Sequence, residues 1–222
     1  MSKKLTRRRF LALSAGAVGG TALTCSGLVV LGTKQPAIGF IEASCGGESN
    51  VNDRILVAYA SQYGSTGEVA KAIGNVLCSP QSPVDVCLAK NVTDLSRYRA
   101  VVVGSAIQGG EWLPEALELI EVHRETLSRV PVAYFLCCKR LRNDTPASRR
   151  EAMGYMDGVR AHVPEINPVQ VGLFAGKVDP STMPLSARLL MALSASPTGD
   201  WRDWDAIRAW ASSLRPMLQI PA

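Results

Sequence analysis

A short apolar run that leads directly into a turn of small hydroxyl residues limits the possible folds of this chain more than any other feature. Residues 55–60 read Ile-Leu-Val-Ala-Tyr-Ala, with no polar alternation. Such a run predicts a strand buried on both faces, hence a central strand of a parallel sheet. Ser-Gln-Tyr-Gly-Ser-Thr follows at 61–66, and apolar residues then recur at helical spacing from Val69 to Leu77. The sequence therefore predicts a strand, a turn and a helix in direct succession.

The turn has the chemistry of an anion site. At the start of a helix, free backbone N–H groups and the positive end of the helix dipole converge. Ser61, Ser65 and Thr66 add hydroxyl donors, and Gly64 lets the backbone approach a ligand closely. Because the turn carries no cation, we expect a phosphate held by N–H and O–H donors. A second interpretation is open: Ser65 and Glu68 also have the spacing of a capping box, which only satisfies the helix end.

Several other phosphate-binding motifs are absent from the sequence. No Gly-x-x-x-x-Gly-Lys occurs, which excludes a Walker loop. The dinucleotide fingerprint is also missing, and the end of the next predicted strand (residues 89–91, Ala-Lys-Asn) has no acid for a ribose. A phospho-receiver domain needs carboxylates at the end of the first strand, and none is present.

The turn resembles the phosphate loop of flavodoxins. Ala-Ser-Gln-Tyr-Gly-Ser-Thr at 60–66 is particularly similar to the flavodoxin-domain group that includes the menaquinone-dependent protoporphyrinogen oxidases. The segment Pro-Thr-Gly-Asp-Trp-Arg-Asp-Trp-Asp at 197–205 looks like the closing segment of the same group. The resemblance runs from about Arg54 to the C-terminus. It implies FMN as the cofactor, with its phosphate wrapped by this loop.

Predicted strands and helices alternate over the remaining chain. Further strands are predicted at 84–88, towards a sheet edge, and at 100–104, 130–138 and 169–175. Helices are predicted from Pro114 to Leu127, from Thr145 to Val163 and from Asp203 or Trp204 onwards. This alternation predicts an α/β fold with a doubly wound five-stranded parallel sheet and helices on both faces. The flavodoxin-like strand order 2-1-3-4-5 is the natural assignment.

In that strand order the ligand binds where the first and third strands diverge. The loops at 61–66 and 105–112 then face the ligand, with 137–140 behind them. Tyr63 and Trp112 are the aromatic residues placed to contact a flavin ring; alternatively, Tyr63 shields the phosphate and Trp112 packs onto its own helix. The predicted cofactor-binding residues are Ser61, Gln62, Tyr63, Gly64, Ser65, Thr66, Ser105, Ala106, Ile107, Gln108, Gly109, Trp112, Cys138 and Lys139.

The cysteines, histidines and acids of the sequence predict neither a metal site nor a group of catalytic residues. No cysteine pair has the Cys-x-x-Cys spacing of a metal site, and no Ser-His-Asp or paired-carboxylate set can be assembled from two histidines and scattered acids. Cys78 with Cys87 is the better candidate for a disulfide in an exported protein. An amphipathic piece at 185–193 is interpreted first as ordinary packing, and second as a surface that meets quinone or membrane.

The positive charge of the chain belongs to its N-terminus. Lys3, Lys4, Arg7, Arg8 and Arg9 precede the first acid, and removing these five from 24 basic residues leaves 19 against 19 acidic ones. The basic pI therefore gives no support to nucleic acid binding.

An uncharged segment follows this basic start. Residues 10–31 would span ~33 Å as a helix, enough to cross a bilayer core. Thr-Arg-Arg-Arg-Phe-Leu at 6–11 resembles the twin-arginine export motif, a route that carries folded proteins. We expect a twin-arginine-type signal or membrane anchor at 1–33, a linker at 34–53 and one domain at 54–222. The domain is then exported across the cytoplasmic membrane, with a possible tether through residues 10–31; cleavage of the signal is left open.

Three functions are compatible with these features. The first is an exported or membrane-tethered FMN-binding domain that transfers electrons to a redox partner protein or quinone. The second, implied by the resemblance, is a flavoenzyme of the protoporphyrinogen oxidase type with a quinone acceptor, although haem assembly is cytoplasmic and the leader points outward. The third is a flavodoxin-shaped binding module without a cofactor.

Overall fold

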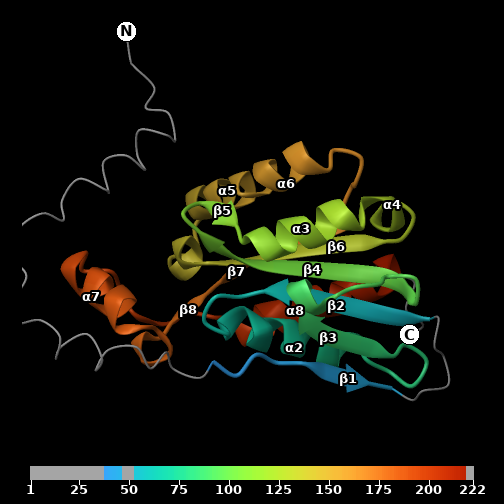
Figure 1. Ribbon diagram of the computed structural model, residues 1–222, viewed down its shortest axis with the longest axis horizontal. Helices are drawn as coiled ribbons and strands as arrows, with labels where there is room; N and C mark the ends of the chain where they lie inside the picture. Colours follow the sequence, from blue (N-terminus) through green and yellow to red (C-terminus); the bar gives the residue numbers. More distant parts are fainter. Residues whose placement is uncertain (1–37, 47–52, 219–222) are drawn as a thin grey trace, which may run out of the picture. The chain divides into compact units, whose positions relative to one another are not determined.

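The core of the protein is a mostly parallel sheet with helices on both faces. The computed structural model describes residues 38–46 and 53–218 (Figure 1). The sheet order is β1-β3-β2-β4-β6-β7, and the strands from β3 to β7 are parallel. Numbered by their place in the chain, these five have the order 2-1-3-4-5, so the predicted fold class and topology are confirmed. Their bounds are Arg54–Ala60 for β2, Val84–Leu88 for β3, Tyr98–Gln108 for β4, Val132–Cys138 for β6 and Gln170–Ala175 for β7.

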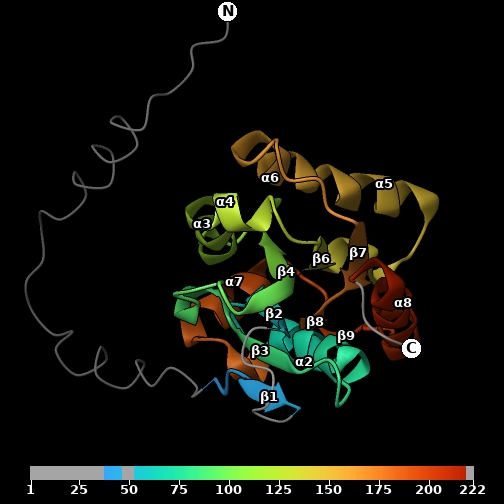
Figure 2. The same ribbon diagram turned by 90° about the vertical axis from the view of Figure 1, so that its right-hand side faces the viewer.

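Two helical layers cover the sheet (Figures 1 and 2). One face carries α2 (Ser65–Leu77) and α8 (Trp204–Met217), and these helices pack on Ile55, Val57 and Tyr59 of β2. The other face carries α3 (Pro114–Val122), α4 (Arg124–Leu127), α5 (Pro146–Gly154) and α6 (Met156–His162). Alternate residues of β2 therefore serve two separate cores, which explains why its apolar run has no polar gaps.

The first described residues extend the sheet, contrary to the predicted linker at 34–53. Strand β1 (Ala43–Cys45) pairs antiparallel with β3 and covers its outer edge. Cys45 forms a disulfide with Cys78 at the end of α2, with the two Cα atoms 6.4 Å apart. The predicted Cys78–Cys87 bond is therefore wrong, and Cys87 is a free thiol.

Polar caps fix the first turns of two helices, which begin where the sequence predicts. Thr145 and Ser148 form a capping box at the start of α5, with Pro146 as the first helical residue. The Asp203 carboxylate accepts from the N–H groups of Asp205 and Ala206 at the start of α8. The predicted helix from 145 to 163 divides at Tyr155 into α5 and α6.

Small elements surround the ends of the strands. A hairpin is formed by β4 and β5 (Glu111–Trp112), and β8 (Lys177–Val178) pairs with β9 (Gly199–Asp200). Between β8 and β9 lies α7 (Leu185–Leu193), and short 3-10 turns occupy 89–91, 139–142 and 180–182. The predicted leader at 1–33 lies outside the described residues. No helix within 38–46 and 53–218 is long and apolar enough to cross a bilayer.

Candidate functional site

The turn between β2 and α2, residues 61–66, is the predicted anion site, and we call it the cradle. Gly64 precedes the first helical residue with φ 87°, a left-handed conformation that favours glycine. Its N–H donates to the Ser61 hydroxyl at 3.0 Å, and its carbonyl accepts from Gly67 at 2.9 Å. Ser65 is the first helical residue and makes no capping hydrogen bond, so the capping-box interpretation is wrong.

Donor groups at the start of α2 are left without protein partners. The Thr66 hydroxyl is fully buried and makes no hydrogen bond, although it lies near the Cys137 thiol. Among the described residues, no acceptor is found for the backbone N–H groups of Tyr63, Ser65 or Thr66. A buried polar group without a partner costs about 1–3 kcal/mol. These donors therefore fit an anion, and the phosphate of a nucleotide cofactor is an anion of the required kind.

A buried arginine from the far end of the chain lies behind this cradle. The side chain of Arg202 is 3% exposed, and its guanidinium pairs with Glu68 of α2 at 3.0 Å and with Asp200 at 2.6 Å. It also stacks on Trp204, 4.5 Å from the ring centroid. Burial lowers the pKa of Arg202, but the hydrogen bonds and charges of its acid partners raise it by more. The segment at 197–205 thus packs against the start of α2 through Arg202.

A cavity of about 350 Å³ opens beside the cradle. Eleven of the fourteen predicted site residues line it: Ser61, Gln62, Tyr63, Ser65, Thr66, Ala106, Ile107, Gln108, Gly109, Cys138 and Lys139. They come from the carboxyl ends of the first, third and fourth parallel strands, which the strand order brings to one edge of the sheet.

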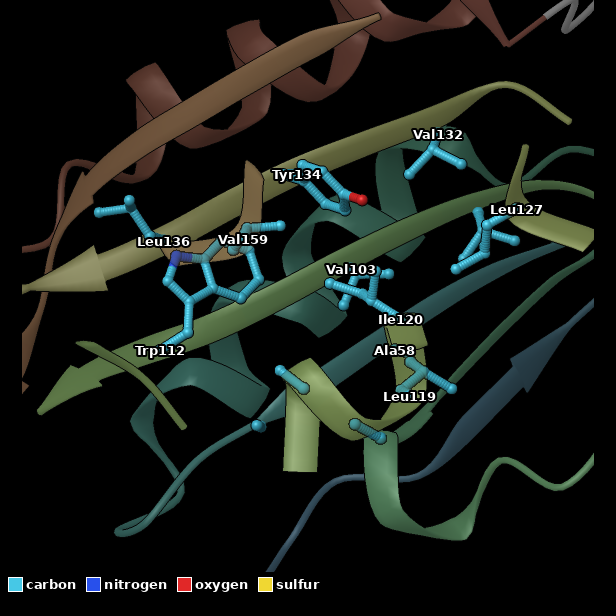
Figure 3. Packing of buried hydrophobic residues seen from close by; sticks show 14 of the residues in the cluster. Ala58, Val103, Trp112, Leu119, Ile120, Leu127, Val132, Tyr134, Leu136 and Val159 are labelled. Carbon is cyan, nitrogen blue, oxygen red and sulfur yellow. The ribbon is translucent and has the colours of Figure 1, made fainter. Parts of the chain in front are cut away.

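Trp112 does not line this cavity. Gly109 and Gly110 both have positive φ, 63° and 89°, and form a tight hairpin turn that returns the chain along β4. The Trp112 indole therefore enters the core, 5.7 Å from the Tyr134 ring centroid in an edge-on arrangement (Figure 3). The prediction that Trp112 contacts a flavin ring is therefore wrong. The indole packs inside the protein instead.

Two further predicted residues support the site without lining it. Ser105 is fully buried; its hydroxyl accepts from the Leu113 N–H at 2.9 Å and donates to the Ala106 carbonyl at 2.8 Å. This pair of bonds shapes the hairpin. Gly64 contributes the backbone conformation at the start of α2 described above.

Eight residues that line the cavity were not predicted from the sequence. The missed residues are Leu113, Cys137, Gly176, Lys177, Val178, Met183, Met191 and Ser196. Gly176 and Lys177 follow the fifth strand directly, so the rule that parallel strands end at one edge could have found them. Met191 and Ser196 lie in or after α7, for which the sequence offers no such rule.

Charged groups around the cavity are few. Lys139 donates to the Ser196 hydroxyl at 2.6 Å, and Lys177 pairs with Asp179 at 3.0 Å. Arg140 pairs with Glu151 and is not part of the lining. No carboxylate or histidine belongs to the cavity lining.

The two cavity cysteines are protonated at neutral pH. Burial raises the pKa of the Cys137 thiol to about 12, and burial also raises the pKa of Cys138. Neither is therefore a thiolate nucleophile. No cluster of metal-binding side chains occurs in the part of the chain that the structure describes.

A second, wider hollow of about 680 Å³ lies along the β1–β3 edge. Asp85 in this hollow accepts hydrogen bonds from Arg54, Arg97 and Tyr98. It contains none of the predicted site residues.

The fold and the site can now be compared with known proteins. Similar solved structures include a flavodoxin from the domain Archaea (19% identity, 75% of this chain and 99% of that one, TM-score 0.43) and oxidised Flavodoxin 2 from Bacillus cereus (17%, 74% and 99%, 0.46). Another is two-electron reduced Megasphaera elsdenii flavodoxin (13%, 72% and 98%, 0.45). No curated protein matches the chain. The model of the flavodoxin domain matches residues 56–205, well over half of the sequence. The chain belongs to the flavodoxin domain family.

Proposed function

We propose that the chain binds FMN in the cavity beside α2 and transfers electrons. FMN is the cofactor of flavodoxin domains. When bound, it supplies the redox chemistry, and the protein orients it and tunes its environment. The observation that carries the proposal is the buried Thr66 hydroxyl, which has no hydrogen-bond partner and lies at the start of α2 beside the cavity.

The residues present fit the cofactor in two parts. Thr66, Ser65 and the free backbone N–H groups would hold the phosphate, supported by the helix dipole. Tyr63, Ile107 and the neighbouring backbone would hold the flavin ring and exclude water from part of it. Arg202 adds no net positive charge to this cradle, because Glu68 and Asp200 neutralise it.

The cavity lining favours an electron carrier over an oxidase of the porphyrinogen type. Removal of hydrogen from carbon requires a positioned acid or base. The ionisable groups of the lining besides the buried thiols and Tyr63 are Lys139 and Lys177. Both lysines could instead attract an acidic redox partner. The electron donor or acceptor is then a redox partner protein or a quinone.

Export of the domain is part of the proposal. Two features support it: the twin-arginine-like motif at 6–11 and the disulfide between Cys45 and Cys78. Disulfides persist in oxidising compartments and are rare in the cytoplasm. Residues 10–31 then tether the domain to the outer face of the membrane or are removed with the signal.

Titration with FMN tests the cofactor assignment. A hydrogen bond to a charged oxygen contributes about 1.5–3 kcal/mol, so Thr66→Val should weaken FMN binding roughly ten- to a hundredfold. Thr66→Ser keeps the hydroxyl and should bind within a few-fold of the parent. Thr126→Val, in α4, is the control for a hydroxyl lost elsewhere.

The outcome is measured by quenching of flavin fluorescence and by the visible spectrum of the purified protein. A parent protein that neither contains nor takes up FMN would leave the third hypothesis, a module without a cofactor. Equal affinities of the Val and Ser variants would show that Thr66 does not contact the phosphate.

A further inference from the structure

The helix α7 exposes an apolar face to solvent. Leu185, Leu189, Leu190 and Leu193 are 62%, 60%, 68% and 78% exposed. At about 100° per residue these four side chains fall within an arc of roughly 140°, which we call the leucine face. Met191 lies on the opposite side of the helix and lines the cavity. The first interpretation of this piece, ordinary packing, is therefore wrong for the leucines.

The leucine face is held outward by fixed contacts. At the end of α7, Ser196 N–H donates to the Met191 carbonyl at 3.0 Å and Ala195 N–H to the Ala192 carbonyl at 3.3 Å, the pattern of a Schellman cap. The Ser196 hydroxyl accepts from Lys139, which joins this cap to the cavity wall. Exposure of the leucines thus follows from the way the helix is anchored.

The charge around the leucine face suits a lipid surface. From Pro180 to Gly199 the sequence contains no acid, and Arg188 is its one charged residue. Helices that lie in the membrane interface combine an apolar face with basic residues, and α7 has the apolar face and one basic residue, Arg188. Exposed apolar patches of this kind mark contact surfaces.

The chain enters the domain at the same end of the sheet. A methyl group built on Gly64 of the cradle would lie 3.2 Å from the Ile38 side chain. Tyr59 then fixes Ile41, accepting from its N–H at 2.8 Å and donating to its carbonyl at 2.9 Å. Leu31 ends the uncharged segment seven residues before Ile38, a distance of at most ~25 Å.

We propose that the leucine face of α7 inserts into the lipid bilayer to which residues 10–31 tether the domain. This inference rests on the proposed tether. Insertion of α7 would hold at the membrane surface the helix whose opposite side, at Met191, forms one wall of the cavity.

The test uses tryptophan as a depth probe in the full chain. Leu193→Trp places an indole in the leucine face. Val122→Trp is the matched control, since Val122 is 68% exposed and ends α3, which leads into α4 and the amino end of β6 (Figure 1). Each variant is reconstituted into vesicles of phosphatidylcholine and phosphatidylglycerol, with and without bromine on the acyl chains. Emission of the parent, with its four tryptophans, is subtracted.

We expect bromine to quench the Leu193→Trp emission several-fold more strongly than that of the control. Equal quenching in vesicle-bound protein overturns the insertion of α7 but leaves the tether intact. A blue-shifted emission that bromine does not quench also overturns it, because α7 is then covered by protein. Protein that does not sediment with vesicles refutes tether and insertion together. The flavin spectrum of the same samples reports cofactor binding separately.

Discussion

Asp85 in β3 gathers more donors than any other carboxylate described above. Arg54 donates to it through Nε at 2.8 Å and Nη2 at 2.5 Å, and the hydroxyls of Ser44 and Tyr98 donate at 2.7 Å and 3.0 Å. Burial raises the pKa of Asp85, but the bonds from Arg54, Ser44 and Tyr98 lower it by more, so the net pKa is below its ordinary value. This carboxylate therefore joins β1, β2 and β4 around β3.

The lowered pKa predicts how stability depends on pH. Because the folded-state pKa is below the unfolded value of about 3.9, the stabilisation is present above that pH and is lost as pH falls through the folded pKa. Breaking a buried ion pair costs about 3–5 kcal/mol, so Asp85→Asn should lower the unfolding free energy by that amount at pH 7.

Urea unfolding from pH 7 to pH 3 measures the effect. The difference between the parent and Asp85→Asn should shrink as the pH falls below about 4. Asp157→Asn, which removes an exposed ion pair with Arg160, is the control and should change stability by less than about 1 kcal/mol. A pH-independent difference at Asp85 would contradict the assignment.

At the scale of elements, the disulfide joins β1, at the edge of the large sheet, to the end of α2. Cys45 ends β1 and Cys78 follows α2, and the two cysteines are 33 positions apart in sequence. Residues 47–52 and the strand β2 lie within this loop. Closing it restricts the unfolded chain and holds β1 against β3.

Replacing both cysteines tests the contribution of this bond. A disulfide that closes a loop of this length stabilises by about 2–4 kcal/mol, so Cys45→Ser with Cys78→Ser should lower the unfolding free energy by that amount. Cys87→Ser alone removes a free thiol and should have a much smaller effect. Denaturant unfolding under oxidising conditions measures both; an unchanged midpoint in the double variant would show that β1 is held by Asp85 and its partners alone.

The sequence predicts the elements of this fold well where their patterns are local. The parallel strands, the helix starts at Thr145 and Asp203, and the cradle at 61–66 depend on neighbouring residues, and the structure has them. The hairpin at Gly109 and Gly110 was predicted only as part of the ligand-facing loop at 105–112, because a glycine pair fits both a loop and a tight turn. Trp112 was misplaced for that reason.

Long-range contacts account for the other differences. The pairing of Cys45 depends on a three-residue strand whose partners in the sheet, Val84 to Val86, are distant in sequence, and no local pattern reveals it. The approach of Arg202 to α2 and of Met191 to the cavity likewise depends on how distant segments meet. An apolar helix face predicts burial in general, and only the surroundings of α7 distinguish a surface from a core.

For the whole molecule, the proposed route out of the cytoplasm makes a direct prediction. Arg7→Lys with Arg8→Lys keeps the charge and removes the arginine pair that the twin-arginine pathway reads. We expect this variant to stay in the cytoplasm, folded and with FMN bound. Cell fractionation with a flavin spectrum of each fraction measures it. Replacing Lys3 and Lys4 with Arg is the control, and normal export of the Arg7, Arg8 variant would refute this pathway.

The redox state of Cys45 and Cys78 should report on which side of the membrane the protein lies. On the proposed route the domain acquires its fold among reducing agents, so both sulfurs cross the membrane as thiols and oxidise only afterwards. Thiols at Cys45 and Cys78 then indicate a molecule in the cytoplasm, and a disulfide indicates an exported one. Alkylation of cells followed by mass spectrometry should find both sulfurs modified in the retained Arg7, Arg8 variant and both protected in the exported parent.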